Sequence, residues 1–187
     1  EALTALPLVM PPTVIGFYLL LLFSPENPFG GAWLQVTGTR LSFSFAGLVI
    51  ASLIYSLPFM VQPLMASFIQ IGRRPLEAAA MLGANSRSAF LRIILPMSLR
   101  GYLTACVLTF AHTVGEFGIV LMVGGNLPGE TRVISIAIYE QVETLDYAAA
   151  HTLSSLLLGF SFVVLVLVYS LNRQGAVSLS ASRQKQS

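Results

Sequence analysis

The chain has 187 residues, of which 55% are hydrophobic and only 10% are charged. Soluble domains carry about 25% charged residues, so this composition excludes an ordinary soluble domain and predicts an integral membrane protein. The net charge of +2 comes from arginines around apolar segments, without the basic stripe of a nucleic-acid-binding surface. The single cysteine, Cys106, excludes an internal disulfide and any cysteine-based metal site, and we expect an inert, packed thiol there.

Four segments are long and apolar enough, or nearly so, to cross a bilayer, which takes about 20 residues in a helix. They cover residues 6–23, 45–69, 97–123 and 152–171. Prolines inside the first two predict kinked helices packed against protein, because neighbouring groups must satisfy the carbonyls that a proline frees. The expected fold is therefore an all-α, polytopic membrane bundle with about four membrane helices.

Arginines indicate the orientation of these segments. They cluster in the connection at 72–96 and after the fourth segment, whereas the connections at 24–44 and 124–147 hold most of the acidic residues. By the positive-inside rule, the 72–96 loop and the C-terminus are cytoplasmic and the other two loops are external. We expect 24–44 to be a turn region with Trp33 as an interface anchor, and the Ser- and Gln-rich tail at 174–187 to be disordered.

The cytoplasmic loop is predicted to contain a short helix over residues 75–82. Pro75 suits the first helical position, Glu77 suits the first turn, and Gly83 suits a left-handed C-terminal cap. Small residues, Ala79 and Ala80 among them, would let another backbone come close. A second helix is expected over 86–94, with Pro96 where the next crossing begins.

A set of residues in this loop occurs at characteristic spacings: Glu77, Ala78, Ala79, Gly83, Ile93, Leu95 and Pro96. The pattern resembles the EAA loop of the membrane-spanning subunits of ABC importers. The resemblance implies a cytoplasmic coupling helix that docks into a groove on a separate ATPase subunit and carries its motion to the membrane helices. On the residues alone, an amphipathic connector between membrane helices is the alternative.

The third segment ends in FAHTVGEFG and places an acidic residue within an apolar stretch. A charge inside a membrane segment marks a functional site by default, and flanking glycines predict a break in the helix there. We expect His112 and Glu116, four residues apart, to form a buried, mutually satisfied contact; a proton relay is an alternative, and two ligands do not make a metal site. The candidate pathway or gate residues are His112, Thr113, Gly115, Glu116 and Gly118.

The outer sequence continues as GGNLPGETR and then VISIAIYEQV. Its candidate contacts for an external binding protein are Asn126, Pro128, Glu130, Thr131 and Arg132. A helix over 131–142 is expected to present Ile134, Ile138 and Val142 on one face. Docking of a partner and simple interfacial packing are both open for this helix.

The blocks FAHTVGEFG, GGNLPGETR with ISIAIYE, and LPLVMPPTVIGFYLLL resemble permease subunits of molybdate and tungstate ABC importers. The resemblance covers residues 6–173 and implies a type I importer permease domain over 1–173, in a homodimer in the cell membrane. It also implies two ATPase subunits and an external solute-binding protein as partners. The family's first membrane helix is missing, and the chain starts without Met or a signal peptide, so we expect a longer natural protein.

The sequence has no Gly-rich phosphate-binding loop. We therefore expect a transport subunit that is not itself an enzyme and has no cofactor, with ATP bound by the partner subunit. The alternatives are a sulfate or thiosulfate ABC permease and, in a different class, a stand-alone secondary anion transporter, although no internal repeat is visible. A small channel is a third class, but no filter motif stands out. The sequence has no cluster of buried Lys or Arg that would bind an anion tightly, so hydrogen-bond donors such as Thr113 would bind it only transiently.

Overall fold

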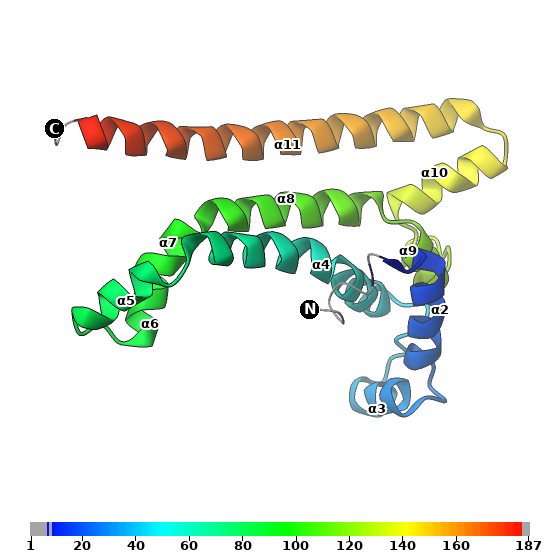
Figure 1. Ribbon diagram of the computed structural model, residues 1–187. Coiled ribbons are helices and arrows are strands. Elements are labelled where there is room, and N and C mark those ends of the chain that lie inside the picture. Colours follow the sequence, from blue (N-terminus) through cyan, green and yellow to red (C-terminus); the bar gives the residue numbers. More distant parts are fainter. Residues whose placement is uncertain (1–6, 8, 185–187) are drawn as a thin grey trace. The chain divides into compact units, whose positions relative to one another are not determined.

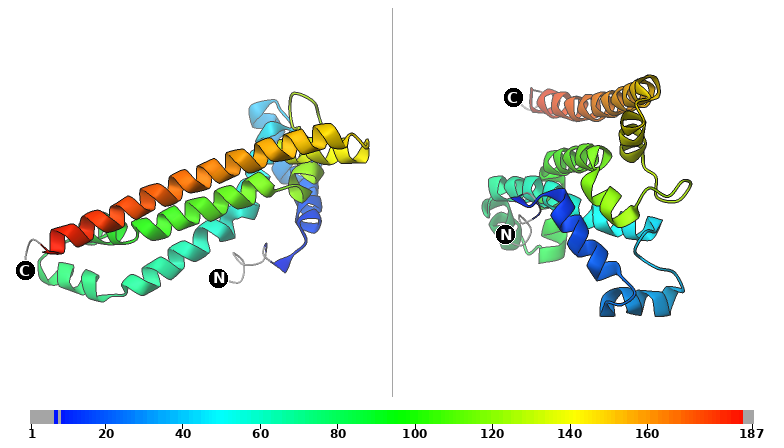
Figure 2. Two further views of the ribbon diagram at one scale, coloured as in Figure 1. Left: turned by 90° about the horizontal axis from the view of Figure 1, so that it is seen from above. Right: turned by 90° about the vertical axis from the view of Figure 1, so that its right-hand side faces the viewer.

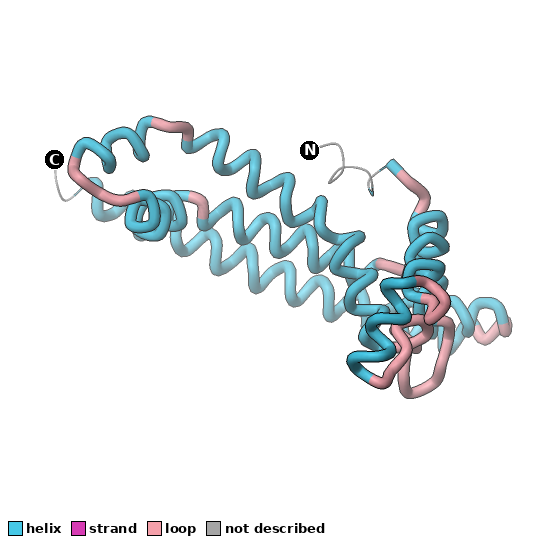
Figure 3. The backbone as a smooth tube through the Cα atoms, turned by 90° about the horizontal axis from the view of Figure 1, so that it is seen from below, coloured by secondary structure: helices cyan, strands magenta, loops and turns pink. Residues whose placement is uncertain are grey.

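A computed structural model describes residues 7 and 9–184, and every regular element in this part of the chain is helical. Figure 1 and Figure 3 show the helices joined by short loops. The elements are α2 (Pro12–Phe23), α3 (Pro28–Thr37), α4 (Phe45–Ile71), α5 (Arg74–Met81), α6 (Ser86–Ala89), the π-helical turn η1 (Phe90–Ile94), α7 (Leu95–Met97), α8 (Leu99–Gly115), α9 (Gly118–Gly124), α10 (Ile134–Glu143) and α11 (Tyr147–Gln184). The all-α prediction is confirmed.

Among the residues that the structure describes, two helices are long and apolar enough to cross a membrane: α4, and α11 over Tyr147–Ser170. A third crossing is made if Ser86–Met97 and Leu99–Gly115, which are bent by 66° relative to each other, count as one broken span. The first predicted segment is different. Its helix α2 has 12 residues, which extend only about 18 Å against a hydrocarbon core of about 30 Å. Residues 1–6 and 8 of that segment lie outside the described residues.

The helices divide into two compact units. The first comprises the described residues up to Pro58 together with Ala111–Phe160, and the second comprises Phe59–Phe110 and the chain from Ser161 onward. The long helices α4, α8 and α11 each contribute residues to both. Within the second unit, α5 and α6 form a short helical hairpin beyond the neighbouring ends of α4 and α8 (Figures 1 and 2).

The core of the first unit is built where α2, α4 and α9 meet. Its buried members are Leu19, Phe23, Leu41, Ala51, Tyr55, Ile119 and Val123. The backbones of α2 and α9 approach closely, because a Cβ placed on Gly118 would lie 2.8 Å from the Cβ of Pro12. The short helix α2 is therefore held by protein packing, as its Pro11-Pro12 sequence predicts.

Three local expectations differ from the structure. The 24–44 loop is not only a turn region, because α3 begins after Asn27, whose side chain accepts a hydrogen bond from the Phe29 N–H, and ends at Gly38 with φ of 72°. The tail at 174–187, predicted to be disordered, continues the helix α11 as far as Gln184, since elongating an existing helix adds one hydrogen bond for each residue fixed; residues 185–187 lie outside the described residues. Cys106 is exposed on α8 rather than packed.

Candidate functional site

Helix α5 has the local structure that its sequence predicts, to within one residue at each end. Pro75 lies in its first turn with Glu77, and Gly83 follows its last turn with φ of 77°. The Gly83 N–H donates to the Ala80 carbonyl at 3.0 Å, and the Ala84 N–H donates to the Ala79 carbonyl at 3.0 Å. This pair of bonds is a Schellman cap, which requires a left-handed residue and so favours glycine.

The apolar side chains of α5 divide between the chain's own interior and open space. Ala79 is buried against its own chain, so it does not form the partner-facing surface that the small residues suggest. In contrast, Met81 is 90% exposed and the following residue Leu82 is 88% exposed, and Leu76 in the first turn is exposed as well. Neighbouring exposed apolar residues such as Met81 and Leu82 are candidates for an interaction surface.

The segment after α5 connects it to the membrane helix α8. Of the three predicted residues here, Ile93 and Leu95 are half-buried, and Pro96 lies inside the helical turn α7 instead of at the beginning of α8. The bend comes two residues later, at Ser98, whose buried hydroxyl donates to the Ile94 carbonyl at 2.8 Å. A π-helical turn and a proline both disturb the helical hydrogen bonds, which accounts for a kink at this place.

A polar network lies within the first unit, between α4 and the end of α8. The Ser56 hydroxyl is 2.8 Å from the Thr113 hydroxyl and 3.3 Å from His112 Nδ1. The Tyr55 ring packs against the His112 ring, with 4.8 Å between their centroids. Sequence reasoning missed Ser56, because no pattern marks one serine of an apolar helix as the partner of residues 56 and 57 positions away.

Glu116 occupies the break between α8 and α9 and is only 7% exposed. Its Oε1 accepts a hydrogen bond from the Ile119 N–H at 3.1 Å, and its backbone carbonyl accepts one from the Ser135 hydroxyl at 2.7 Å. His112 Nε2 is 4.0 Å from Oε2. The predicted break at Glu116 is confirmed. The expected mutual contact is only part of the arrangement, since the carboxylate mainly satisfies a free N–H at the start of α9.

The two glycines beside Glu116 differ in their surroundings. A Cβ on Gly115 would meet nothing within 4 Å, whereas Gly118 is pressed against Pro12. Thr113 is exposed, with its hydroxyl bonded to Ser56. The structure therefore brings Thr113, His112 and Glu116 together, while Gly118 belongs to the packing of α2 on α9.

The loop between α9 and α10, predicted to be external, divides into a buried and an exposed part. Thr131 is 1% exposed, and its hydroxyl donates to the Gly124 carbonyl at 2.7 Å while it accepts from the Leu127 N–H at 3.1 Å. It shapes the loop from inside and, unlike most of the other predicted contacts, is not exposed to a partner in this structure. Pro128 and Glu130, which are also candidate contacts for a binding protein, are exposed on this loop.

Arg132 connects the loop to α10. Its Nε donates to Asn126 Oδ1 at 2.8 Å, and a terminal guanidinium nitrogen lies 3.3 Å from Glu140 Oε2. Asn126 Nδ2 also donates to Glu140 Oε2, at 3.2 Å. These three side chains form a closed set of charge-assisted bonds that fixes the loop on the helix.

Helix α10 forms where a helix is expected, but a different face packs. Ile136 is buried with Leu48 and Val120, whereas Ile134 and Val142 of the predicted stripe are exposed. The hydrogen bonds of Ser135 with the Glu116 carbonyl and of Arg132 with Asn126 and Glu140 hold α10 with its Ile136 face inward. Near its end, a hydrogen bond from Tyr139 to Glu143 raises the pKa of the Tyr139 hydroxyl above its ordinary value of 10.0, with the nearby negative charge as a further cause.

Among the described residues, no group of three or more His, Cys, Asp or Glu side chains could hold a metal ion. The polar groups that the structure brings together are small sets of hydroxyl, amide and carboxylate groups at helix ends. Together with the apolar spans α4 and α11, they define the chain as a helical membrane protein.

Comparisons with known proteins agree with this class. A family model described as "Binding-protein-dependent transport system inner membrane component" matches residues 1–174. The molybdenum transport system permease protein ModB of Azotobacter vinelandii is 50% identical over 172 residues, which cover 92% of this chain and 76% of that relative. ModB of Haemophilus influenzae is 41% identical over 140 residues, covering 74% of this chain and 61% of the relative. The sulfate transport system permease protein CysT of Escherichia coli is 33% identical over 172 residues, covering 92% and 61%.

The match to the family model covers most of the chain. This chain belongs to the family of inner membrane components of binding-protein-dependent transport systems. It is a multi-pass membrane protein.

Proposed function

We propose that this chain is the membrane-spanning permease subunit of an ABC importer that translocates molybdate or tungstate. Helix α5 is the observation that carries the importer assignment. It is a capped, eight-residue helix at the end of two membrane helices, and it leaves Met81 and Leu82 exposed. The margin between 50% identity to a molybdenum permease and 33% identity to a sulfate permease supports the substrate.

In this proposal α5 docks into a groove on an ATPase subunit. Met81 and Leu82 supply apolar anchors, which carry most of the affinity of a small interface. The turns η1 and α7 continue from the docked loop directly into the bend before α8. Movement of the ATPase subunit would therefore change the bend at Ser98 and reach the membrane helix. ATP is bound by that partner, and this chain needs no cofactor of its own.

The network around Glu116 fits a structural or gating role. A buried carboxylate would repel a dianion, so Glu116 does not ligate the substrate. It holds the beginning of α9 and, through Ser135, the beginning of α10. Thr113 is the exposed member and can offer a hydroxyl to a passing anion. His112, Gly115 and Glu116 keep the helix break in which Thr113 lies.

The external loop is the proposed contact for a solute-binding protein. Its exposed candidates are Pro128, Glu130 and Arg132, and Asn126 holds Arg132 in position. A second copy of the chain completes the pathway in a homodimer. The arginine distribution places the α5 loop and the C-terminus on the cytoplasmic side.

The proposal is tested with purified complex in proteoliposomes that contain ATP and the cognate binding protein. Molybdate and tungstate should each stimulate ATP hydrolysis and be taken up, and sulfate should compete poorly. Stimulation by sulfate equal to that by molybdate would favour a sulfate or thiosulfate permease. Uptake that is independent of an ATPase subunit would favour a secondary transporter and contradict the importer assignment.

A further inference from the structure

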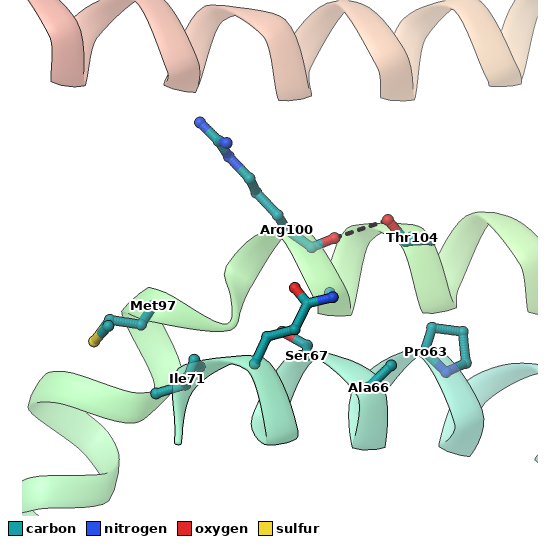
Figure 4. Close-up of a pocket in the computed structure, with 9 residues that line it drawn as sticks. Pro63, Ala66, Ser67, Ile71, Met97, Arg100 and Thr104 are labelled. Atoms are coloured by element: carbon teal, nitrogen blue, oxygen red, sulfur yellow. Dashed lines mark hydrogen bonds between the residues drawn. The ribbon is translucent and has the colours of Figure 1, made fainter. Parts of the chain in front are cut away.

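A groove in the second unit runs along the seam between α4 and α8, and its lining combines polar side chains with apolar residues such as Pro63, Ile71 and Met97. Its volume is about 530 Å³. Its polar lining includes Ser67 of α4 and Arg100 and Thr104 of α8 (Figure 4). Gln70 of α4 and Gly101 of α8 also line it. It lies at the ends of these helices that adjoin the α5 loop, since α4 ends at Ile71 and α8 begins at Leu99.

The two helices cross closely at this groove. A Cβ on Gly101 would lie 2.4 Å from the Cβ of Ser67 and 2.5 Å from its hydroxyl oxygen, so a larger residue at 101 would push the helices apart. Small residues at a membrane helix crossing allow this approach. As a result, the Ser67 side chain is held at the crossing of the two helices.

Two of the polar groups in the groove have hydrogens available to a ligand. Serine and threonine in helices often bond to the carbonyl one turn back. Thr104 does so, with its hydroxyl 3.0 Å from the Arg100 carbonyl. Within the described part of the chain, the side chains of Ser67 and Gln70 make no hydrogen bond, although both line the groove.

The charge of the lining is suited to an anion. None of its nine residues is acidic, and Arg100 is the one charged residue among them. The Arg100 guanidinium points away from Ser67 in Figure 4. It therefore contributes positive electrostatic potential and the aliphatic part of its side chain to the groove, and no direct hydrogen bond at the helix crossing. Polar residues at membrane depth generally face a water-filled cavity or the interior of the protein.

We propose that this groove is a low-affinity transit site for the tetrahedral oxyanion, with hydrogen bonds donated by Ser67 and Gln70. This inference rests on the proposed function. At about 30 Å³ for each water, the volume corresponds to roughly 18 waters, so the anion passes with much of its hydration retained. Weak binding follows, as a pathway requires, because a tightly held ion leaves slowly.

The sign of a charge placed at Gln70 tests the site. In proteoliposomes with binding protein and ATP, Gln70→Glu should lower molybdate uptake per ATP hydrolysed by about tenfold or more, because the added carboxylate repels the passing anion. Gln70→Lys should keep uptake at or above that of the wild type, and Gln70→Leu should lower it by a few-fold. Gln62→Leu, on the exposed face of the same helix and outside the groove, is the matched control and should resemble the wild type. Equal losses in the Glu and Lys variants would show a packing role and overturn the inference.

A second measurement tests directly whether molybdate occupies the groove. In a Cys106→Ser background, Ser67→Cys should react with an anionic methanethiosulfonate reagent, and millimolar molybdate should slow that reaction. An unchanged rate would overturn the transit site. A wild-type complex that fails to transport molybdate contradicts the proposed function, whereas a transporting complex with no sign effect at Gln70 contradicts the groove alone.

Discussion

Glu116 shows how a buried acidic residue is accommodated at a helix break in this chain. Its carboxylate accepts the Ile119 N–H, one of the donors that a helix start leaves without a partner. Its carbonyl is bonded by Ser135, and His112 lies beside it at 4.0 Å. The side chain thus acts as the cap of α9 and the junction of three helices. We therefore expect the position of the accepting oxygen to matter more for stability than the charge.

Replacement of Glu116 separates these two contributions. Glu116→Gln keeps an accepting oxygen for the Ile119 N–H, so the stability of the detergent-solubilised protein should stay near that of the wild type. Glu116→Ala removes the cap and should cost about 0.5–2 kcal/mol, seen as a lower thermal unfolding temperature. Glu26→Ala, an exposed acidic residue, serves as the control. Equal destabilisation by Gln and Ala would mean that the charge itself is required.

At the level of the elements, the helices with strong local signals are those that the sequence predicts well. Helix α5 begins with Pro75 and ends before Gly83, and both signals act within a few residues. The same kind of signal was present in Asn27, Pro28 and Gly38 around α3, but the glycines and prolines of that loop favoured an interpretation as turns.

Features that depend on distant residues were not predictable. The buried face of α10 is set by Ile136 against Leu48 and Val120, far away in sequence, and not by the periodicity of Ile134 and Val142. Thr131 looked like a loop surface residue, yet its hydroxyl is turned inward to the Gly124 carbonyl. The pattern of a single sequence does not indicate which residues far apart in the chain come into contact in the folded protein. For the same reason, Ser56 and Ser135 were absent from the predicted site.

The positions of α3 and α5 on opposite sides of the membrane follow if α4 crosses the bilayer once between them. Val36 on α3 is 86% exposed and Met81 on α5 is 90% exposed, so a cysteine at either place should be reactive. In a Cys106→Ser background without ATPase subunits, an impermeant maleimide should label Val36→Cys in intact cells. Met81→Cys should be labelled only after the membrane is opened. Labelling of Met81→Cys from outside would invert the proposed orientation.

On the scale of the whole molecule, the chain combines two compact units that share the long helices α4, α8 and α11. The first unit contains the external loop and the Glu116 network, and the second contains the α5 loop and the groove at Ser67. Composition and periodicity were sufficient to predict a helical membrane protein. They did not predict the short length of the described helix α2 or the 66° bend before α8, because both depend on prolines and packing within the folded chain.

The central claim is that α5 couples ATP hydrolysis in a partner subunit to transport. Gly83 and Gly38 provide a matched pair to test it, since their φ angles are 77° and 72° and a Cβ on either would meet nothing within 4 Å. Replacement by Asp should therefore cost each helix end a similar amount, about 1–2 kcal/mol, through the left-handed backbone. Only Gly83 adjoins the proposed docking surface.

The decisive measurement is binding-protein-stimulated ATP hydrolysis, together with molybdate uptake, by complexes that carry Gly83→Asp or Gly38→Asp in proteoliposomes. The account predicts that Gly83→Asp lowers both activities by about tenfold or more, equivalent to at least 1.4 kcal/mol, while Gly38→Asp stays near the wild type. Wild-type activity in Gly83→Asp, or an equal loss in both variants, would contradict it.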